Sequence, residues 1–190
     1  MSTFTTILET TDDVIDTLIR LDLELVDISV GITNFQPVRF VIFGATALLL
    51  HTGFRGTSDI DVYMKNRDIH SDITSICNKY SVNNNMQRVM EFPLAEDFWD
   101  RSKLIYESEV MHVHLASKED LVLSKLFAGR GKNTDEVDLI ESSILDDCKM
   151  DYIQQMYDEY DSLRIGSGVN FTRLDDIIQK REEFKQRQES

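Results

Sequence analysis

The spacing of apolar residues separates helices from strands in the first third of the chain. Steps of four and three residues predict an amphipathic helix that opens at Thr11 or Asp12, and its apolar stripe comprises Val14, Leu18, Leu21, Leu25 and Ile28. The apolar run 38–43 lies between a proline and a glycine, which predicts a buried strand. A helix is predicted over 45–51, and a second strand follows in which Ile60, Val62 and Met64 alternate with polar residues.

The rest of the chain predicts further strands and then mainly helices. A helix is expected over 68–80, strands and turns over 81–116, and helices over 121–129, 134–145, 150–163 and from 172 to the end. This order predicts an α+β fold, with a mixed sheet flanked by helices and a helical C-terminal portion. We expect one main domain over residues 1–148, including the N-terminal helix, and a helical segment over 149–190.

Composition and charge narrow the class of protein. The 190 residues are 42% apolar, which is ordinary for a globular domain. A net charge of −14 argues against broad binding to phosphate backbones or acidic membranes. The two cysteines form no metal-binding or disulfide pattern, the start of the chain lacks signal-peptide features, and the longest near-apolar run, 41–50, is about half of a membrane span. We therefore expect a cytoplasmic protein without a membrane partner.

Two carboxylates, Asp59 and Asp61, stand two residues apart on the second predicted strand, so both face the same way. Their Cα atoms are about 7 Å apart at the rise of a strand. Like charges this close are unfavourable without a cation, and Mg²⁺ commonly uses one or two carboxylates together with substrate phosphates. An isolated Asp-x-Asp is more often a solvated strand face, but the apolar neighbours and the preceding glycine favour a metal site here.

Gly44 stands where the first strand passes into a helix. A glycine there lets a triphosphate approach the backbone, and a helix N-terminus favours anions. Arg55 precedes the carboxylates in a turn, where it pairs with a phosphate or positions Asp59.

The stretch Phe43-Gly44-Ala45-Thr46-Ala47, followed by Arg55-Gly56-Thr57-Ser58-Asp59-Ile60-Asp61, resembles the first motif of nucleotidyltransferase-fold proteins. Its Arg-x-Thr-x-Asp-Ile-Asp form is similar to the AbiEii-type toxins and their relatives among minimal nucleotidyltransferases. The resemblance implies that residues 1–148 are a nucleotidyltransferase-like domain that uses a nucleoside triphosphate with Mg²⁺ or Mn²⁺. It implies metal binding and catalysis by Asp59 and Asp61, and nucleotide binding by Gly44, Ala45, Thr46, Arg55 and Thr57.

A second motif, Leu123-Ser124-Lys125-Leu126-Phe127-Ala128-Gly129-Arg130 with Asp135-Glu136-Val137-Asp138, resembles the Lys-Leu…Arg…Asp-x-x-Asp segment of the same family. It implies that Lys125 neutralises the triphosphate, that Arg130 binds nucleotide and that Asp138 is catalytic. The resemblance covers roughly residues 38–145.

The residues of the second motif can also be interpreted from their positions on the predicted helices alone. Lys125 shares a predicted helix face with apolar side chains, so its ammonium points inward to a partner or snorkels along the surface. We expect it to approach Asp59 and Asp61 when no nucleotide is bound. Asp135 and Asp138, one turn apart near a helix start, are functional or stabilise the helix end.

The sequence departs from the family pattern at two positions. Ala45 stands where the family usually has serine, with Thr46 beside it. The family's third carboxylate corresponds to His114 in the strand Met111-His112-Val113-His114-Leu115. Histidine can act as a general base for the acceptor near neutral pH but is a poor ligand for magnesium. His112 faces the same way and is interpreted as an ordinary strand residue.

Two functions remain open at this point. The first is an enzyme that transfers a nucleoside monophosphate to a hydroxyl of an RNA end, a protein or a small molecule, with a toxin–antitoxin role as one form. A small-molecule acceptor would resemble the lincosamide and aminoglycoside nucleotidyltransferases. The second is a nucleotide-binding or interaction protein that kept the fold without catalysis. In the second case the N-terminal helix would serve a partner or a dimer. An antitoxin or, in a homodimer, a second copy of the chain is the expected kind of protein partner. A basic patch near the expected site comprises Lys118, Lys125, Arg130 and Lys132.

Overall fold

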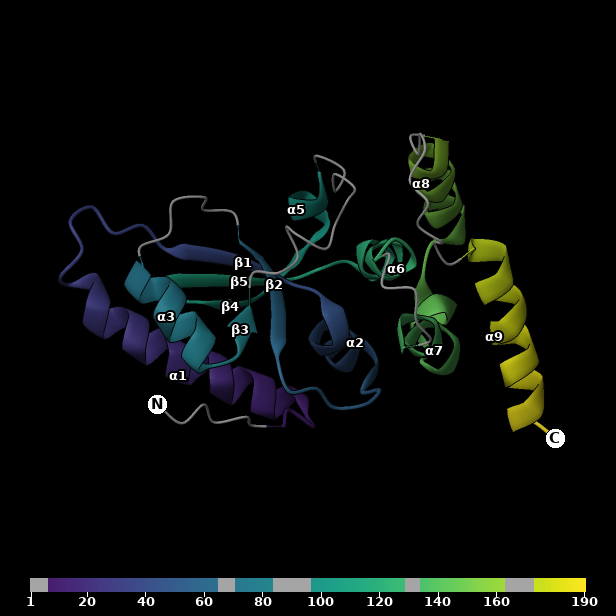
Figure 1. Cartoon of the computed structure of the whole chain (residues 1–190), viewed down its shortest axis with the longest axis horizontal. Helices are drawn as coiled ribbons and strands as arrows, with labels where there is room; N and C mark the ends of the chain where they lie inside the picture. The colour runs from purple at the N-terminus through teal and green to yellow at the C-terminus, as the bar shows by residue number, and fades with distance from the viewer. Residues whose placement is uncertain (1–6, 65–70, 84–96, 129–133, 163–172) are drawn as a thin grey trace.

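A five-stranded mixed sheet forms the centre of the fold, with the strands in the order β3-β2-β1-β5-β4 (Figure 1). The computed structural model describes residues 7–64, 71–83, 97–128, 134–162 and 173–190. Strand β1 is antiparallel to β2 and parallel to β5, β2 is parallel to β3, and β4 is antiparallel to β5. The strands are β1 (Val38–Ile42), β2 (Ile60–Met64), β3 (Val82–Asn83), β4 (Lys103–Glu107) and β5 (Met111–Leu115).

Helices surround this sheet and extend beyond one end of it. The bounds are α1 (Thr11–Ser29), α2 (Gly44–Thr52), α3 (Ser71–Lys79), α5 (Phe98–Arg101), α6 (Lys118–Leu126), α7 (Thr134–Glu141), the 3₁₀ helix η1 (Ile144–Asp147), α8 (Met150–Ser162) and α9 (Leu174–Gln188). The predicted α+β class, with a mixed sheet flanked by helices and a helical C-terminal portion, is confirmed.

The alternation of side chains divides the sheet into two faces. The main core includes Phe40, Ile60 and Val113 from three neighbouring strands, and the buried residues of α1, α2 and α3 join it. On the opposite face, Val41 and Phe43 form a smaller cluster with Phe98, Ala116, Tyr63 and Trp99. Because side chains alternate along β2, Asp61 shares this second face with Tyr63.

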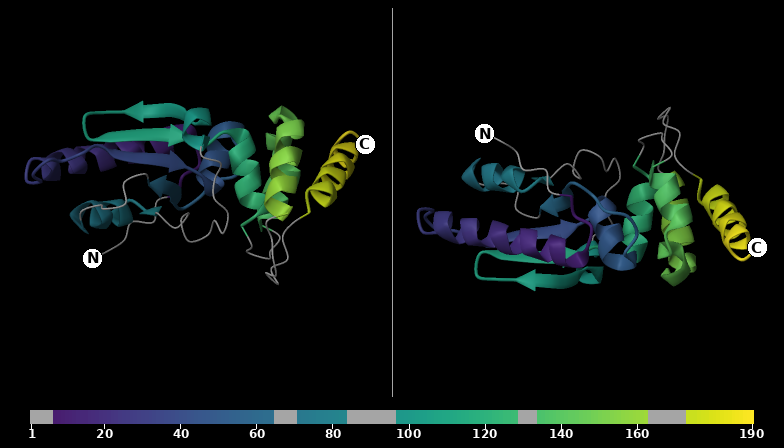
Figure 2. Two further views of the ribbon diagram at one scale, coloured as in Figure 1. Left: turned by 90° about the horizontal axis from the view of Figure 1, so that it is seen from above. Right: turned by 90° about the horizontal axis from the view of Figure 1, so that it is seen from below.

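The main core continues into the helical C-terminal portion. Leu121 of α6, Leu139 of α7, Ile153 of α8 and Ile177 of α9 belong to the same buried cluster as the sheet. Figure 2 shows α6, α8 and α9 gathered at one end of the molecule. The predicted division after residue 148 stays a prediction. Within the described residues, no helix has both the length and the apolar composition that crossing a membrane requires.

Helix α1 begins at Thr11, as predicted, and Thr10 caps it: the Thr10 hydroxyl accepts from the backbone of Asp13 while the Asp13 carboxylate accepts from the Thr10 backbone. Other element boundaries differ from the sequence prediction. Helix α7 ends at Glu141 and a separate 3₁₀ turn follows it. The region predicted as strands and turns contains the short helix α5.

Candidate functional site

A cavity of about 650 Å³ lies between the sheet and helices α6 and α7. Most of the predicted site residues line it: Gly44, Ala45, Arg55, Thr57, Asp59, Asp61, Lys125 and Asp138. Ser124, Thr134 and Asp135 belong to the wall made by α6 and α7, and Ile7 contributes from the segment before α1. Two motifs far apart in the sequence therefore face one space.

Gly44 and Asp61 are in close contact at the start of α2. Gly44 has a positive φ of 64°, which residues with a Cβ seldom adopt. A Cβ built on Gly44 would stand 2.4 Å from Oδ2 of Asp61. Glycine is thus required both by the backbone conformation and by the close approach of the carboxylate, which places Asp61 against the N-terminal end of a helix.

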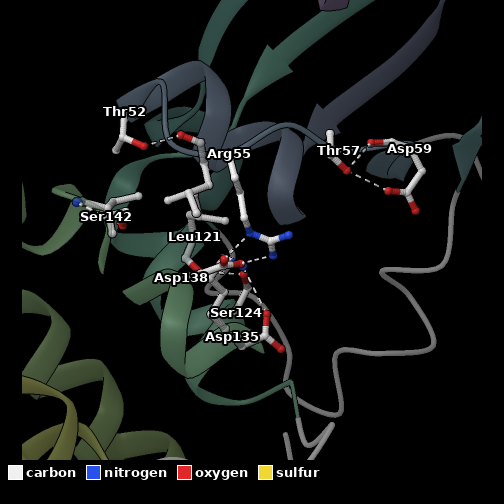
Figure 3. A network of polar contacts seen from close by, with 12 residues as sticks. Thr52, Arg55, Thr57, Asp59, Leu121, Ser124, Asp135, Asp138 and Ser142 are labelled. Carbon is white, nitrogen blue, oxygen red and sulfur yellow. Dashed lines mark hydrogen bonds and ion pairs between the residues drawn. The ribbon is translucent and has the colours of Figure 1, made fainter. Parts of the chain in front are cut away.

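Asp59 was predicted on a strand but lies in the loop, one residue before β2 begins. Neutral hydrogen-bond donors hold its carboxylate. The Thr57 hydroxyl donates to Oδ1 at 3.1 Å, and the Asn83 amide donates to Oδ2 at 3.1 Å. The buried Thr46 hydroxyl donates to the Asp59 backbone carbonyl at 2.6 Å. These bonds fix the carboxylate without cancelling its charge, and Figure 3 shows the Thr57–Asp59 contact.

The facing wall holds an ion cluster around Asp138. Arg55 donates from Nε and Nη2 to the two carboxylate oxygens of Asp138, at 2.7 and 3.0 Å. Lys125 donates from Nζ to Oδ2 of Asp138 at 2.7 Å and to Oδ1 of Asp135 at 3.1 Å. Figure 3 shows Arg55 directed at Asp138, with Asp135 beside them. One loop of the first motif is thereby tied to both helices of the second.

Burial sets the electrostatics of this cluster. The Asp138 side chain is 1% exposed and that of Lys125 is 4% exposed. Burial alone would raise the pKa of Asp138, but the hydrogen bonds from Arg55 and the charge of Lys125 outweigh it and hold that pKa below its ordinary value. The hydrogen bond to Asp138 raises the pKa of Arg55 in turn. Asp138 is therefore ionised and saturated with donors at neutral pH.

Comparison with known families agrees with this geometry. The family model described as "Nucleotidyltransferase of unknown function (DUF6036)" matches residues 16–189. The chain belongs to this family. No curated protein and no solved structure matches the chain. The narrower resemblance to AbiEii-type toxins stays a prediction.

Within this nucleotidyltransferase fold, Lys125 differs from its predicted position. We expected its ammonium to approach Asp59 and Asp61, but it donates hydrogen bonds to Asp135 and Asp138. The prediction that it points inward is confirmed, since Lys125 is 5% exposed. Because α7 packs beside α6, its carboxylates reach Lys125 directly.

His114, which we expected in place of the family's third carboxylate, is not among the residues that line the cavity. It lies opposite Val41, which pairs with Tyr63 on the other side, so His114 is level with Tyr63. Continuing both registers by two residues brings Ala116 level with Asp61. The His114 ring contacts the Ser102 hydroxyl at 2.9 Å and the Trp99 ring, and burial lowers its pKa. The expected general base is thus packed in the aromatic cluster, away from the cavity lining.

The remaining predicted residues have mixed outcomes. Thr46 lies beneath the cavity, where it holds the backbone of Asp59. Arg130 and Lys132 lie outside the described residues. Asn83 binds Asp59 but was not predicted, because a two-residue strand has no detectable period.

The chemistry of Asp59 and Asp61 fits a hard divalent cation. Both side chains offer oxygen ligands and line the same cavity as the N-terminus of α2. Across the described ranges, no group of three or more His, Cys, Asp or Glu side chains is arranged to hold a metal ion. Two protein carboxylates completed by phosphate oxygens match how Mg²⁺ binds with nucleotides.

Proposed function

We propose that the protein transfers a nucleoside monophosphate from a nucleoside triphosphate to a hydroxyl acceptor, with Mg²⁺ or Mn²⁺ held by Asp59 and Asp61. The observation that carries the proposal is the packing of the Asp61 carboxylate against Gly44 at the start of α2, inside a cavity of about 650 Å³. The family description supports the reaction class. The acceptor, the metal and the nucleotide are part of the proposal.

Each wall of the cavity has a role in this reaction. The start of α2 at Gly44 offers backbone N–H groups to phosphate oxygens. Asp59 is fixed by Thr57 and Asn83, so it presents its oxygens without rearrangement. The cation, when bound, would stabilise the negative charge that develops on the phosphates. Lys125 supplies positive charge from the facing wall.

The transfer is an in-line displacement at the α-phosphorus. The acceptor oxygen forms a bond to the α-phosphorus as the bond to the bridging oxygen of the β-phosphate breaks. Pyrophosphate leaves, and the proton of the acceptor hydroxyl is lost to water. The acceptor belongs to one of three classes, an RNA end, a protein or a small molecule, and the first is the one that a toxin role would use.

A second candidate function is nucleotide binding without transfer. The observation in its favour is that, among the described residues that line the cavity, the side of the sheet supplies two carboxylates, Asp59 and Asp61. Two carboxylates bind a metal–nucleotide complex but leave the acceptor hydroxyl without a carboxylate base. Binding and transfer therefore have to be measured separately.

The experiment measures nucleotide binding and nucleotide transfer with the full chain. Each of the four nucleoside triphosphates, labelled at the α-phosphate, is incubated with Mg²⁺ or Mn²⁺ and with total RNA, cell-extract protein or small-molecule extract. Transfer requires label in an acceptor and release of pyrophosphate, and Asp61→Asn should abolish it. Asp151→Asn on the exposed face of α8 removes the same charge elsewhere and should have no effect. Nucleotide binding without label transfer would favour the second candidate, and no binding at saturating metal would reject both.

A further inference from the structure

Helix α1 and its C-cap residue, Val30, carry a row of exposed apolar side chains on the outer side of the helix. Ile19, Leu23, Val26 and Val30 are 41%, 61%, 43% and 89% exposed. Steps of four, three and four residues place them on one face, which we call the α1 outer stripe. The buried residues of α1, such as Leu18 and Leu25, lie on the other side, in the core. In the view from below, α1 lies in front of the sheet along its length (Figure 2).

The stripe concentrates exposed apolar surface in one place. It holds four of the eight large apolar side chains that are exposed in the described residues. Single exposed apolar residues are normal on protein surfaces, but a contiguous row marks an interaction site. The spacing is that of the seam along which one helix packs on another.

The charges beside the stripe are mainly acidic. Asp16 and Asp27 are exposed carboxylates that border it along α1, and the exposed Asp12 lies in line with it, seven residues before Ile19. Asp22, on the other border, is turned toward the sheet and accepts from the Ser108 hydroxyl at 2.5 Å. Arg20 is also exposed, further round the helix. The rim therefore favours a partner with basic residues beside its own apolar face.

We propose that the α1 outer stripe is the docking surface for a partner protein that presents a basic amphipathic helix. The apolar side of that helix covers the four stripe residues, and its lysines or arginines pair with Asp16 and Asp27. A second copy of this chain fits less well, because two copies would bring the same carboxylates together and each chain carries a net charge of −14. This surface lies outside the cavity lining, so the proposal does not depend on the proposed function.

The test uses the full chain and a synthetic helical peptide of about three heptads, with leucine at the a and d positions and lysine at e and g. Its counterpart has glutamate in place of lysine. Binding is measured by anisotropy for the wild type and for the double variant Leu23→Gln, Val26→Gln, since glutamine suits an exposed helix. Ile178→Gln on α9, where Ile178 is 37% exposed, makes the same change outside the stripe. Sedimentation gives the oligomeric state of each protein.

We expect the lysine peptide to bind the wild type and Ile178→Gln equally, and the double variant roughly ten-fold or more weakly. Asp16→Asn with Asp27→Asn should weaken binding less and reduce its dependence on salt. Failure of the lysine peptide to bind, or unchanged binding to the double variant, would overturn the proposal. Equal binding of the glutamate peptide would also do so. A wild-type dimer that the double variant loses would assign the stripe to a second copy instead.

Discussion

Two pairs of aspartates face the same cavity, and different groups hold them. Asp59 accepts hydrogen bonds from a hydroxyl and an amide, and Asp61 lies against Gly44. Asp138 accepts from the guanidinium of Arg55 and the ammonium of Lys125, which Asp135 shares. Both pairs consist of the same residue type at short spacing, yet their surroundings give them different chemistry.

Neutral donors and cationic donors have opposite consequences for a carboxylate. Thr57 and Asn83 orient Asp59 but leave its negative charge, so an added cation gains the full attraction. Arg55 and Lys125 neutralise Asp138, which is buried, so this carboxylate has little to gain from a metal ion. The comparison supports our proposal that Asp59 holds a metal ion, and it favours a structural role for Asp138.

The largest expected effect is the loss of Asp138. In Asp138→Asn, the buried Lys125 and the Arg55 guanidinium lose the carboxylate that receives three of their hydrogen bonds. Breaking a buried ion pair by removing one partner costs about 3–5 kcal/mol. Urea denaturation should show this decrease in the free energy of unfolding. A decrease as small as that of an exposed substitution, such as Asp151→Asn, would contradict the structural role.

A second effect separates backbone strain from contact with Asp61. Gly44→Ala and Gly53→Ala both place a Cβ at a positive φ, 64° and 66°, which costs about 1–2 kcal/mol. At Gly53 no described atom lies within 4 Å of the added Cβ, whereas at Gly44 it meets the Asp61 carboxylate. Gly44→Ala should be the less stable variant and should lose Mn²⁺ binding, measured by electron paramagnetic resonance. Gly53→Ala serves as the control, and equal Mn²⁺ affinity in both variants would argue against a metal at Asp61.

The sequence was sufficient to find the first pair. Asp59 and Asp61 are close in the chain, and the apolar residues around them, with Gly44 before them, indicated a shared site. Both line one cavity, although Asp59 lies just before β2 and not on it. The requirement for glycine at position 44 is likewise local, because the φ of this residue is positive.

Side-chain contacts that depend on how distant helices pack and distant strands pair could not be predicted in the same way. Lys125 finds Asp138 because α7 packs beside α6. His114 is not among the residues that line the cavity, and the pairing of β1 with β5 sets it level with Tyr63 and not with Asp61. A shift of two residues along a strand keeps the alternation of faces, so the sequence pattern does not distinguish the two positions.

A smaller effect is the pH dependence that Asp138 contributes. Its pKa is lowered in the folded protein, so it stabilises the fold above the pKa of an unfolded aspartate, about 3.9. That stabilisation is lost as the pH falls through the lower, folded pKa. Between neutral pH and acid, the wild type should therefore lose more unfolding free energy than Asp138→Asn. Asp13 and Asp146 also have lowered pKa values but are present in both proteins. Parallel curves from urea denaturation would contradict the prediction.

The smallest expected effect is a gain of affinity, and it comes from Asp135. Asp138 receives three hydrogen bonds from Arg55 and Lys125 and its side chain is 1% exposed, whereas Asp135 receives one from Lys125 and its side chain is 19% exposed. An entering phosphate can therefore replace Asp135 at the Lys125 ammonium while Asp138 keeps the lysine in place.

In Asp135→Asn, the phosphate no longer competes with a carboxylate, and one negative charge is removed from the cavity wall. Tripolyphosphate without metal should then bind roughly ten-fold more tightly, a change of about 1.4 kcal/mol, as measured by the fluorescence of the single tryptophan, Trp99, or by calorimetry. Glu136→Gln on the same helix removes an equal charge from a side chain that pairs with Lys180, and it should leave the affinity unchanged. If Asp135→Asn binds tripolyphosphate no better than Glu136→Gln while the wild type binds it, Lys125 is a structural residue and its partners belong to the fold alone.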